Sequence, residues 1–324
     1  MTHDFILIAF GFDGKGGGKR LRDEEVSEWI RDDRPAWAHL DATRPETREW
    51  LHKEISYLDP YVAEALLASE TRPRMTQIGD GALLILRGAN LNENAAPEDM
   101  VSVRLWIDSH RIISVQRRTL TAVKDVEEKL SGGCGPLDTG EFVAMLALRL
   151  FERMQPALNQ LDDDADRIEE RILERADTSL REDIIAIRKK AILFRRYMAP
   201  QREAVDELRM ADLSWLNEIH RRHLQESYNH VTRYVEDLDA VRERSQIVKD
   251  ELANMISDKL NRNMYVLSVI ASIFLPLGFL TGLLGINVGG LPGANSPYAF
   301  WIFCGFLATL IIAQVWIFKK LRWF

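Results

Sequence analysis

The sequence predicts an α+β membrane protein with an oligomeric pore, in which an N-terminal cytoplasmic α/β domain and a long stalk helix precede two C-terminal transmembrane helices. Three observations predict this architecture. Residues 263–318 contain no Asp, Glu, Lys, Arg or His. A helical pattern runs from about Ser214 without glycine or proline until Pro276, so the stalk helix continues into the first transmembrane helix. Short apolar or alternating segments, bounded by Gly, Asp and Pro, fill the first 130 residues.

The composition is ordinary only on average. The 324 residues, enough for about two domains, are 46% hydrophobic and 28% charged, but nearly all the charge lies before residue 263. A formal net charge of −7 argues against a nucleic-acid partner, since phosphate binding needs clustered positive charge. An acidic surface instead concentrates cations. Cys134 and Cys304 lie far apart, so we expect no structural disulfide and a reducing compartment.

Residues 1–130 form the expected cytoplasmic α/β domain. Its strands are predicted by short apolar or alternating runs, at 4–10, 36–40, 82–87, 101–107 and 111–116. The last two surround Asp-Ser-His and predict a hairpin. Helical periodicity is found near 23–33, 45–56 and 60–69. The glycine-rich stretch 131–140 is the expected domain boundary.

Residues 131–262 form the expected long-helix and stalk region. Asp138-x-x-Glu141 and Ser179-x-x-Glu182 resemble capping boxes and predict helices near 140–176 and 179–209. Pro200 is expected to kink or end the second helix. The third helix, of some 60 residues, would be roughly 90 Å long. A globular domain rarely builds such a helix for itself, whereas a coiled bundle or a stalk needs one.

Residues 263–324 form the expected transmembrane pore domain, with spans 264–284 and 299–318. The first span would be roughly 31 Å long as a helix, which matches the hydrocarbon thickness of a bilayer. Basic residues stand only on one side of the pair: Lys259, Arg262, Lys319, Lys320 and Arg322. By the positive-inside rule, both termini are cytoplasmic and the connecting loop is outside.

Two spans per chain cannot enclose a water-filled path, so a pore needs several copies, each giving one helix. Heptad-like steps along the first span select a lining stripe that is small and mildly apolar: Met264, Ser268, Ala271, Leu275, Gly278 and Gly282. The same steps lead back to polar residues, Asn261, Ser257, Asn254 and Asp250. The alternative is that Gly278-x-x-x-Gly282 serves only as a helix-packing face.

Motifs of soluble enzymes are absent, so we expect no enzyme and no cofactor. The stretch "FDGKGGGKR" lacks the spacing of a phosphate-binding loop and is expected to be a turn. His220 and His223, three residues apart on a charged helix, could bind a metal ion or be solvated histidines. Asp250 is either an exit or subunit-interface metal site or a surface carboxylate. The acidic stretch "LDDDADRIEE" at 161–170 is expected to be solvated and to attract divalent cations.

Gly285-Ile286-Asn287 ends the first span, and a glycine-rich loop, a second span and a basic tail follow. This arrangement resembles the CorA-type divalent-cation transporter family, whose signature here is Gly-Met-Asn. Ile286 in place of methionine resembles the zinc-transporting ZntB-like branch, as do residues 70–92 and 97–107. The resemblance covers essentially the whole chain. The family pattern also has an acidic residue after the loop proline, where this sequence has Gly293.

The resemblance implies a homopentamer in the bacterial inner membrane, in contact with the lipid bilayer and with divalent metal cations. It implies a ring of Asn287 side chains at the entrance, with Gly285 at the turn and Ile286 packed behind. The transported ion would be Zn²⁺, with Co²⁺, Ni²⁺, Cd²⁺ and Mg²⁺ as other candidates, and uptake would be proton-coupled. Two alternatives stay open: a magnesium, cobalt or nickel channel, and a membrane-anchored sensor or scaffold.

Overall fold

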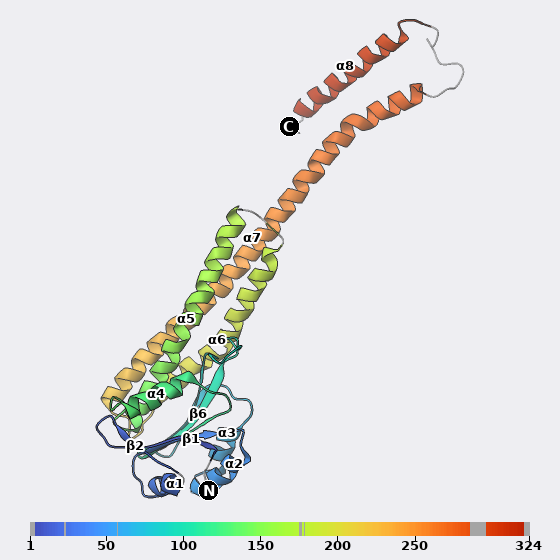
Figure 1. The fold of residues 1–324 in the computed structure, drawn as a ribbon. Coiled ribbons are helices and arrows are strands. Elements are labelled where there is room, and N and C mark those ends of the chain that lie inside the picture. Colours follow the sequence, from blue (N-terminus) through green and yellow to red (C-terminus); the bar gives the residue numbers. More distant parts are fainter. Residues whose placement is uncertain are drawn as a thin grey trace. The chain divides into compact units, whose positions relative to one another are not determined.

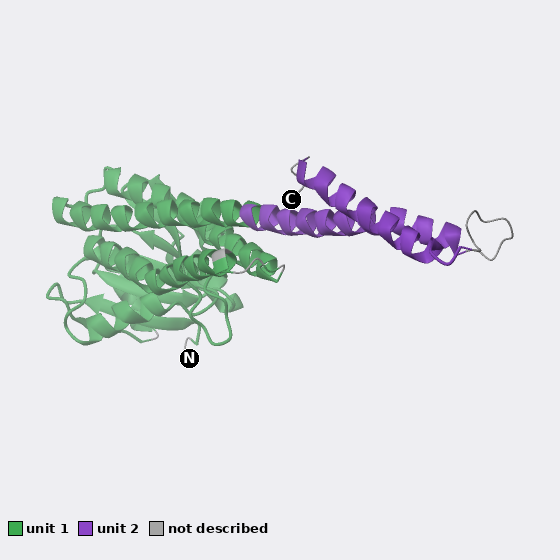
Figure 2. Cartoon of the chain, turned by 90° about the horizontal axis from the view of Figure 1, so that it is seen from above, with its two compact units in different colours: residues 1–250 green, residues 251–324 purple. Residues whose placement is uncertain are grey.

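The structure is a computed structural model that describes residues 4–22, 24–56, 58–174, 177, 179–285 and 296–320. Its contacts divide the chain into two compact units, residues 1–250 and 251–324 (Figure 2). The first unit contains a mixed sheet and most of the helices. The second contains the end of one long helix and a separate C-terminal helix.

The sheet of the first unit has seven strands in the order β2-β1-β3-β7-β6-β5-β4. Their bounds are β1 Ile6–Phe12, β2 Gly18–Arg20, β3 Ala36–Asp41, β4 Arg74–Ile78, β5 Gly81–Gly88, β6 Val101–Ile107 and β7 Arg111–Gln116. Only the β3–β7 pairing among these strands is parallel. The five expected strands and the hairpin at Asp108-Ser109-His110 are confirmed. The glycine-rich stretch after β1 is a turn, as expected, in which Asp13 Oδ1 accepts from the backbone N–H groups of Lys15 and Gly17.

Helices cover both faces of the sheet (Figure 1). On one face, α1 (Glu24–Arg31), α2 (Pro45–Glu54) and α3 (Pro60–Leu67) enclose an apolar core with alternate strand residues such as Leu40 and Trp106. On the other face, Trp37 of β3 packs against Phe142 of the long helix α5, with ring centroids 4.8 Å apart. Both faces therefore bury apolar side chains, as the continuous apolar strands require.

Three long helices follow α4 (Thr121–Ser131): α5 (Thr139–Glu174), α6 (Leu180–Met210) and α7 (Glu218–Leu284). One bond of the expected capping box of α5 is present, since Glu141 N donates to Asp138 Oδ1 at 2.9 Å. Glu141 Oε2 accepts from the N–H of Leu137, one residue before the N-cap, at 2.8 Å. The side chain of Ser179 makes no capping hydrogen bond. Pro200 does not end α6, which continues to Met210. The glycine-rich stretch expected as a boundary lies between α4 and α5, inside the first unit.

Buried polar groups join these helices to the sheet. Gln201 of α6 is fully buried, and its amide accepts from the backbone N–H of Arg87 at 2.5 Å and donates to the Arg87 carbonyl at 3.0 Å. At the β4–β5 turn, Asp80 accepts from Ser214 N at 2.8 Å and from Trp215 Nε1, through its carbonyl, at 2.8 Å. These bonds fix the connection between α6 and α7 against the sheet.

The second unit has the end of α7 and helix α8 (Ala299–Lys320). Two helices of the described chain, α7 and α8, are long and apolar enough to cross a membrane. Only 6% and 0% of their most apolar windows are buried. A core helix of a soluble protein would be mostly buried, so this exposure separates them from that class.

Candidate functional site

The membrane part of α7 has two different sides. Val269 is 8% exposed, and Ile273 and Pro276 are half-buried. At about 100° per residue, Ala271 and Leu275 lie on the opposite side of the helix, and both are exposed. The expected lining stripe therefore lies on an uncovered side of α7, although residues beside it such as Phe274 and Phe279 are exposed as well.

The whole stripe is exposed in the single chain, from its polar to its apolar end. The exposed positions are Asp250, Asn254, Ser257, Asn261, Met264, Ser268, Ala271, Leu275, Gly278 and Gly282. A Cβ atom built at Gly278 or Gly282 would meet nothing within 4 Å among the described residues. Helix packing through these glycines, the alternative role for the motif, therefore needs a second copy of the chain.

The expected selectivity motif begins where α7 ends. The N–H of Gly285 donates to the Thr281 carbonyl at 2.9 Å, so the helical hydrogen-bond pattern reaches this residue. A Cβ atom at Gly285 would lie 2.9 Å from the same carbonyl oxygen, closer than real Cβ atoms approach. Glycine thus fits this turn without strain. Ile286 and Asn287 lie outside the described residues.

The two candidate histidines lie in different environments. His220 is 5% exposed, and its Nε2 lies 3.2 Å from Asp138 Oδ1. Its ring also packs on Gly140, where a Cβ would come within 2.1 Å of Nδ1. His223 is exposed. The structure therefore does not bring the two imidazoles to one shared surface.

Asp250 lies exposed on α7, where both of its carboxylate oxygens accept from Gln246 Nε2 at 2.9 Å. The structure brings neither candidate histidine to it. Within the described ranges, no group of three or more His, Cys, Asp or Glu side chains is arranged to hold a metal ion.

The acidic stretch of α5 is partly neutralised by α7. Arg244 of α7 forms ion pairs with Asp162 at 2.6 Å and with Asp166. Arg167 pairs with Asp164 on the same helix. The attraction of this stretch for cations is therefore smaller than its acidic residues alone suggest.

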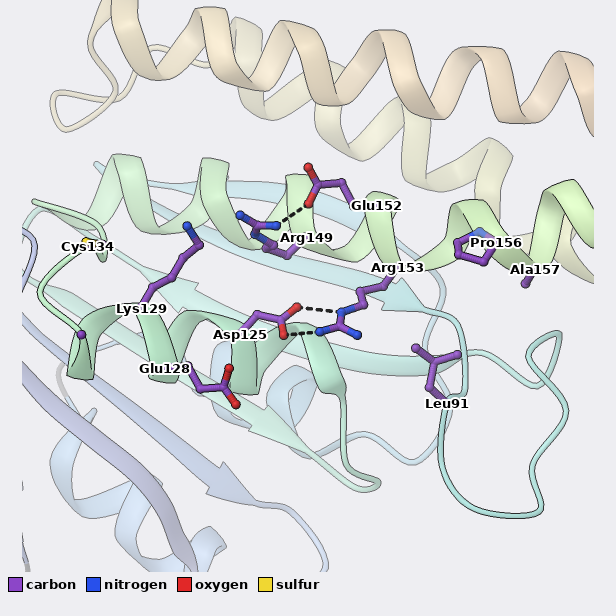
Figure 3. A pocket seen from close by; sticks show the side chains of 11 residues that line it. Leu91, Asp125, Glu128, Lys129, Cys134, Arg149, Glu152, Arg153, Pro156 and Ala157 are labelled. Carbon is purple, nitrogen blue, oxygen red and sulfur yellow. Dashed lines mark hydrogen bonds and ion pairs between the residues drawn. The ribbon is translucent and has the colours of Figure 1, made fainter.

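An open groove of about 700 Å³ lies between α4 and α5 (Figure 3). Four of its six charged side chains are paired with one another: Asp125 with Arg153 at 2.6 Å and Arg149 with Glu152 at 2.7 Å. Glu128 and Lys129 also line the groove. Among the described residues no three His, Cys, Asp or Glu side chains converge on a metal position, so the stripe on α7 remains the candidate site.

One residue near the stripe had no assigned role in the sequence reasoning. Gln314 is the only carboxamide in the apolar segment 299–318, and its Nε2 lies 3.4 Å from the carbonyl oxygen of Ser272 on α7. A polar side chain inside an apolar span is a usable sequence signal. Its partner could not be read from the sequence, because helix-to-helix register is a property of the packing.

A family model described as "CorA-like Mg2+ transporter protein" matches residues 32–320. The chain belongs to this CorA family. Family members are divalent-cation transporters and not enzymes, so the expectation of a transporter is confirmed. The two apolar C-terminal helices accordingly make the chain a membrane protein.

Named relatives cover the chain almost end to end. The divalent cation transporter CmaX of Pseudomonas aeruginosa is 37% identical, over 98% of this chain and 96% of that protein. The zinc transport protein ZntB of Pectobacterium carotovorum is 36% identical, over 100% and 97%. The resemblance to the ZntB-like branch, inferred from the sequence, is thus confirmed.

Solved structures share the fold. The full-length CmaX structure superposes with a TM-score of 0.85 at 36% identity, covering 98% of both chains. The CorA magnesium transporter of Methanocaldococcus jannaschii gives 0.78 at 20% identity, covering 98% of this chain and 99% of that one. The predicted architecture of an α/β domain, a long helix and two C-terminal apolar helices is confirmed.

Proposed function

We propose that this CorA-family chain transports zinc across the bacterial inner membrane as a homopentamer, with α7 lining the pore. The observation that supports this most is the exposed stripe on α7, which is polar from Asp250 to Asn261 and small or apolar from Met264 to Gly282. A cation path needs polar groups where the ion is hydrated and a narrow, weakly binding wall where it crosses the apolar region.

In this proposal, five Asn287 side chains ring the entrance, two residues after Gly285. Carboxamide oxygens are neutral acceptors, so they hydrogen-bond the waters of a hydrated cation without trapping it as carboxylates would. Both termini lie in the cytoplasm, because the basic residues flank the spans on that side. Lipid would cover α8, whose surface is almost uniformly apolar.

The choice of zinc is supported by the ZntB relative, whose printed name gives zinc as its transported ion. Magnesium is the second candidate, supported by the description of the family model. The outer loop has no acidic residue, so capture there would be weak and would involve a hydrated ion. Direct proton coupling would have to use groups outside 263–318, such as Asp250, since that segment has no Asp, Glu, Lys, Arg or His.

Flux into proteoliposomes loaded with a zinc-sensitive dye tests the proposal, with and without an inward proton gradient. We expect zinc entry that the gradient accelerates and that Asn287→Ala alters, while Asn94→Ala in the first unit leaves it unchanged. Zinc entry at the same rate with and without the gradient would contradict proton coupling and would still support a pore. Faster entry of magnesium than of zinc, measured with a magnesium dye, would assign the second candidate.

Asn287→Leu separates transport from the sensor or scaffold alternative. A membrane anchor tolerates this change, whereas an entrance ring that must contact hydrated ions does not. If wild-type oligomers transport none of zinc, magnesium and cobalt, the sensor or scaffold alternative is favoured.

A further inference from the structure

Pro276 leaves one carbonyl of α7 without its helical partner. In an α-helix, the N–H of each residue donates to the carbonyl four residues earlier, and proline has no N–H. The carbonyl that loses its donor is therefore that of Ser272. Both residues lie on half-buried parts of the helix surface.

Gln314 of α8 donates to this same oxygen. Its Nε2 lies 3.4 Å from Ser272 O. Backbone groups freed by proline in a membrane helix must be satisfied by neighbouring helices, by side chains or by water. The Gln314 side chain thus supplies from α8 the hydrogen bond that Pro276 cannot make.

Only the donor side of this amide is used. Gln314 Oε1 is buried and makes no hydrogen bond in the part of the chain that the structure describes. A buried polar atom without a partner is costly, and an apolar side chain would avoid that cost. The contribution that offsets it is the bond from Nε2 to α7.

We propose that Gln314 is a positioning residue for the cation path: its bond to Ser272 O holds the proline site of α7 in one geometry and so fixes where Leu275 and Gly278 face. The inference rests on the proposed role of α7 as pore lining. Without the bond, the helix around Pro276 lacks one main-chain constraint, and the residues beyond it can reorient.

A double-mutant cycle tests the bond itself, independently of transport. Full-length protein in detergent micelles is titrated with SDS, and unfolding is followed by tryptophan fluorescence in the wild type, Gln314→Met, Pro276→Ala and the double variant. Methionine keeps the length and removes the donor. We expect Gln314→Met to raise the unfolding equilibrium constant roughly three- to twentyfold in the wild type. In the Pro276→Ala background we expect no such rise, because alanine restores a backbone N–H that bonds Ser272 O and methionine also removes the unpaired Gln314 Oε1.

Thr309→Val is the matched control on the same helix. The Thr309 hydroxyl donates to the Gly305 carbonyl of α8 itself at 2.8 Å, so its removal cannot depend on residue 276. Equal effects of Gln314→Met in both backgrounds would overturn the proposed pairing. The pairing would also be overturned if the effect of Thr309→Val on the unfolding equilibrium constant differed in the same way between the wild-type and Pro276→Ala backgrounds.

Divalent-cation flux through the same four proteins tests the positioning role. We expect Gln314→Met to change the flux at least about threefold, and to have no further effect once Pro276→Ala is present. If the SDS titration shows coupling but Gln314→Met transports at the wild-type rate, Gln314 stabilises the helix pair without positioning the cation path, and the positioning role is wrong. Absence of flux in the wild type would instead contradict the proposed function, while the titration would still decide the hydrogen bond.

Discussion

The two units of this chain place their aromatic side chains by opposite rules. In residues 1–250, Phe142 and Trp37 are at most 1% exposed and contact each other across the sheet–helix interface. In residues 251–324, Phe274 is 67% and Trp301 71% exposed. The first unit hides its apolar surface within one chain. The second presents it outward on nearly every side.

This difference tells where each unit gets its stability. Apolar burial contributes about 25 cal/mol per Å² removed from water, and the first unit gains it from its own folding. A helix that is apolar all round is stable only when lipid or another protein surface surrounds it. For residues 1–250, the contribution of a side chain to stability can therefore be inferred from the single chain. For residues 251–324, it depends on the bilayer and on other copies.

A matched pair of phenylalanine truncations sharpens the comparison most. Phe142→Ala is expected to destabilise the first unit by about 3–5 kcal/mol, because it empties a fully buried site. Phe306→Ala, at a side chain that is 53% exposed, should leave the same unfolding transition unchanged. Denaturant titration of the full chain in detergent measures both. Equal losses would break the comparison, since Phe306 would then be part of a core shared with the first unit.

The next largest effect is a dependence of stability on pH that belongs to the first unit. Burial lowers the pKa of His39 to about 4 from the ordinary 6.5, although the nearby side chains of Gln116 and Asp41 act in the opposite direction. The unfolded chain therefore binds a proton that the folded chain excludes. The contribution of His39 to the free energy of unfolding is fully present above about pH 6.5. It is lost as the pH falls from there toward 4, by on the order of 3 kcal/mol.

The variant that isolates this effect is His39→Gln, which removes the titration. Its melting temperature, measured between pH 4 and 7.5, should fall less steeply with acidification than that of the wild type. His52→Gln, at an exposed position, serves as the control. Parallel profiles for wild type and His39→Gln would show that another group governs the acid response.

Gln201→Leu should cost at least about 2 kcal/mol. The change leaves the backbone N–H and carbonyl of Arg87 without their buried partner, and each unpaired group costs about 1–3 kcal/mol. Gln160→Leu is the exposed counterpart and should stay within about 0.5 kcal/mol of the wild type. Urea midpoints compare the two. A small loss for Gln201→Leu would mean that water replaces the amide between α6 and β5.

The smallest effect lies in the second unit and tests the two roles of its glycines. Among the described residues of the single chain, a Cβ at Gly278 meets nothing within 4 Å. Alanine also removes the flexibility of glycine inside a helix, so Gly278→Ala should stabilise α7 by up to about 1 kcal/mol. Size-exclusion chromatography and SDS titration follow the oligomer. Loss of the oligomer would show that copies pack backbone to backbone here, against the pore-lining role.

Sequence patterns predicted the buried parts of the first unit well, because strands such as 82–87 carry apolar side chains on both faces. They missed β4, whose residues are half exposed and partly polar, and β2, which has only three residues. They also missed α4, although Ala122, Val126 and Leu130 repeat every four residues. Pro200, expected to kink or end α6, does not end it, and the neighbouring Gln201 holds this part of the helix on the sheet.

The candidate site was predictable where it depends on one helix. The heptad-like steps place the stripe on one side of α7, because helical periodicity is local, and all its residues are exposed in the single chain; its role as pore lining stays a prediction. The environments of His220 and His223 were not predictable, since Asp138 and Gly140 reach His220 from a distant part of the chain. The Gln314 contact was missed for the same reason. Residues 286 and 287, the centre of the motif, keep the role inferred from the family signature.

The order of contacts along the chain has a consequence for biosynthesis. The last strand of the sheet, β7, ends at Gln116. Gln201 and Ser214, which are synthesised later, hydrogen-bond Arg87 and Asp80 and so attach α6 and the connection after it to the sheet. At about 5–20 residues per second, the ribosome needs roughly 3 to 10 seconds to proceed from Ser214 to Met264. Most of the first unit can therefore complete its sheet and lock it while the apolar spans are still unmade. Its water-soluble fold would then be in place before membrane insertion begins.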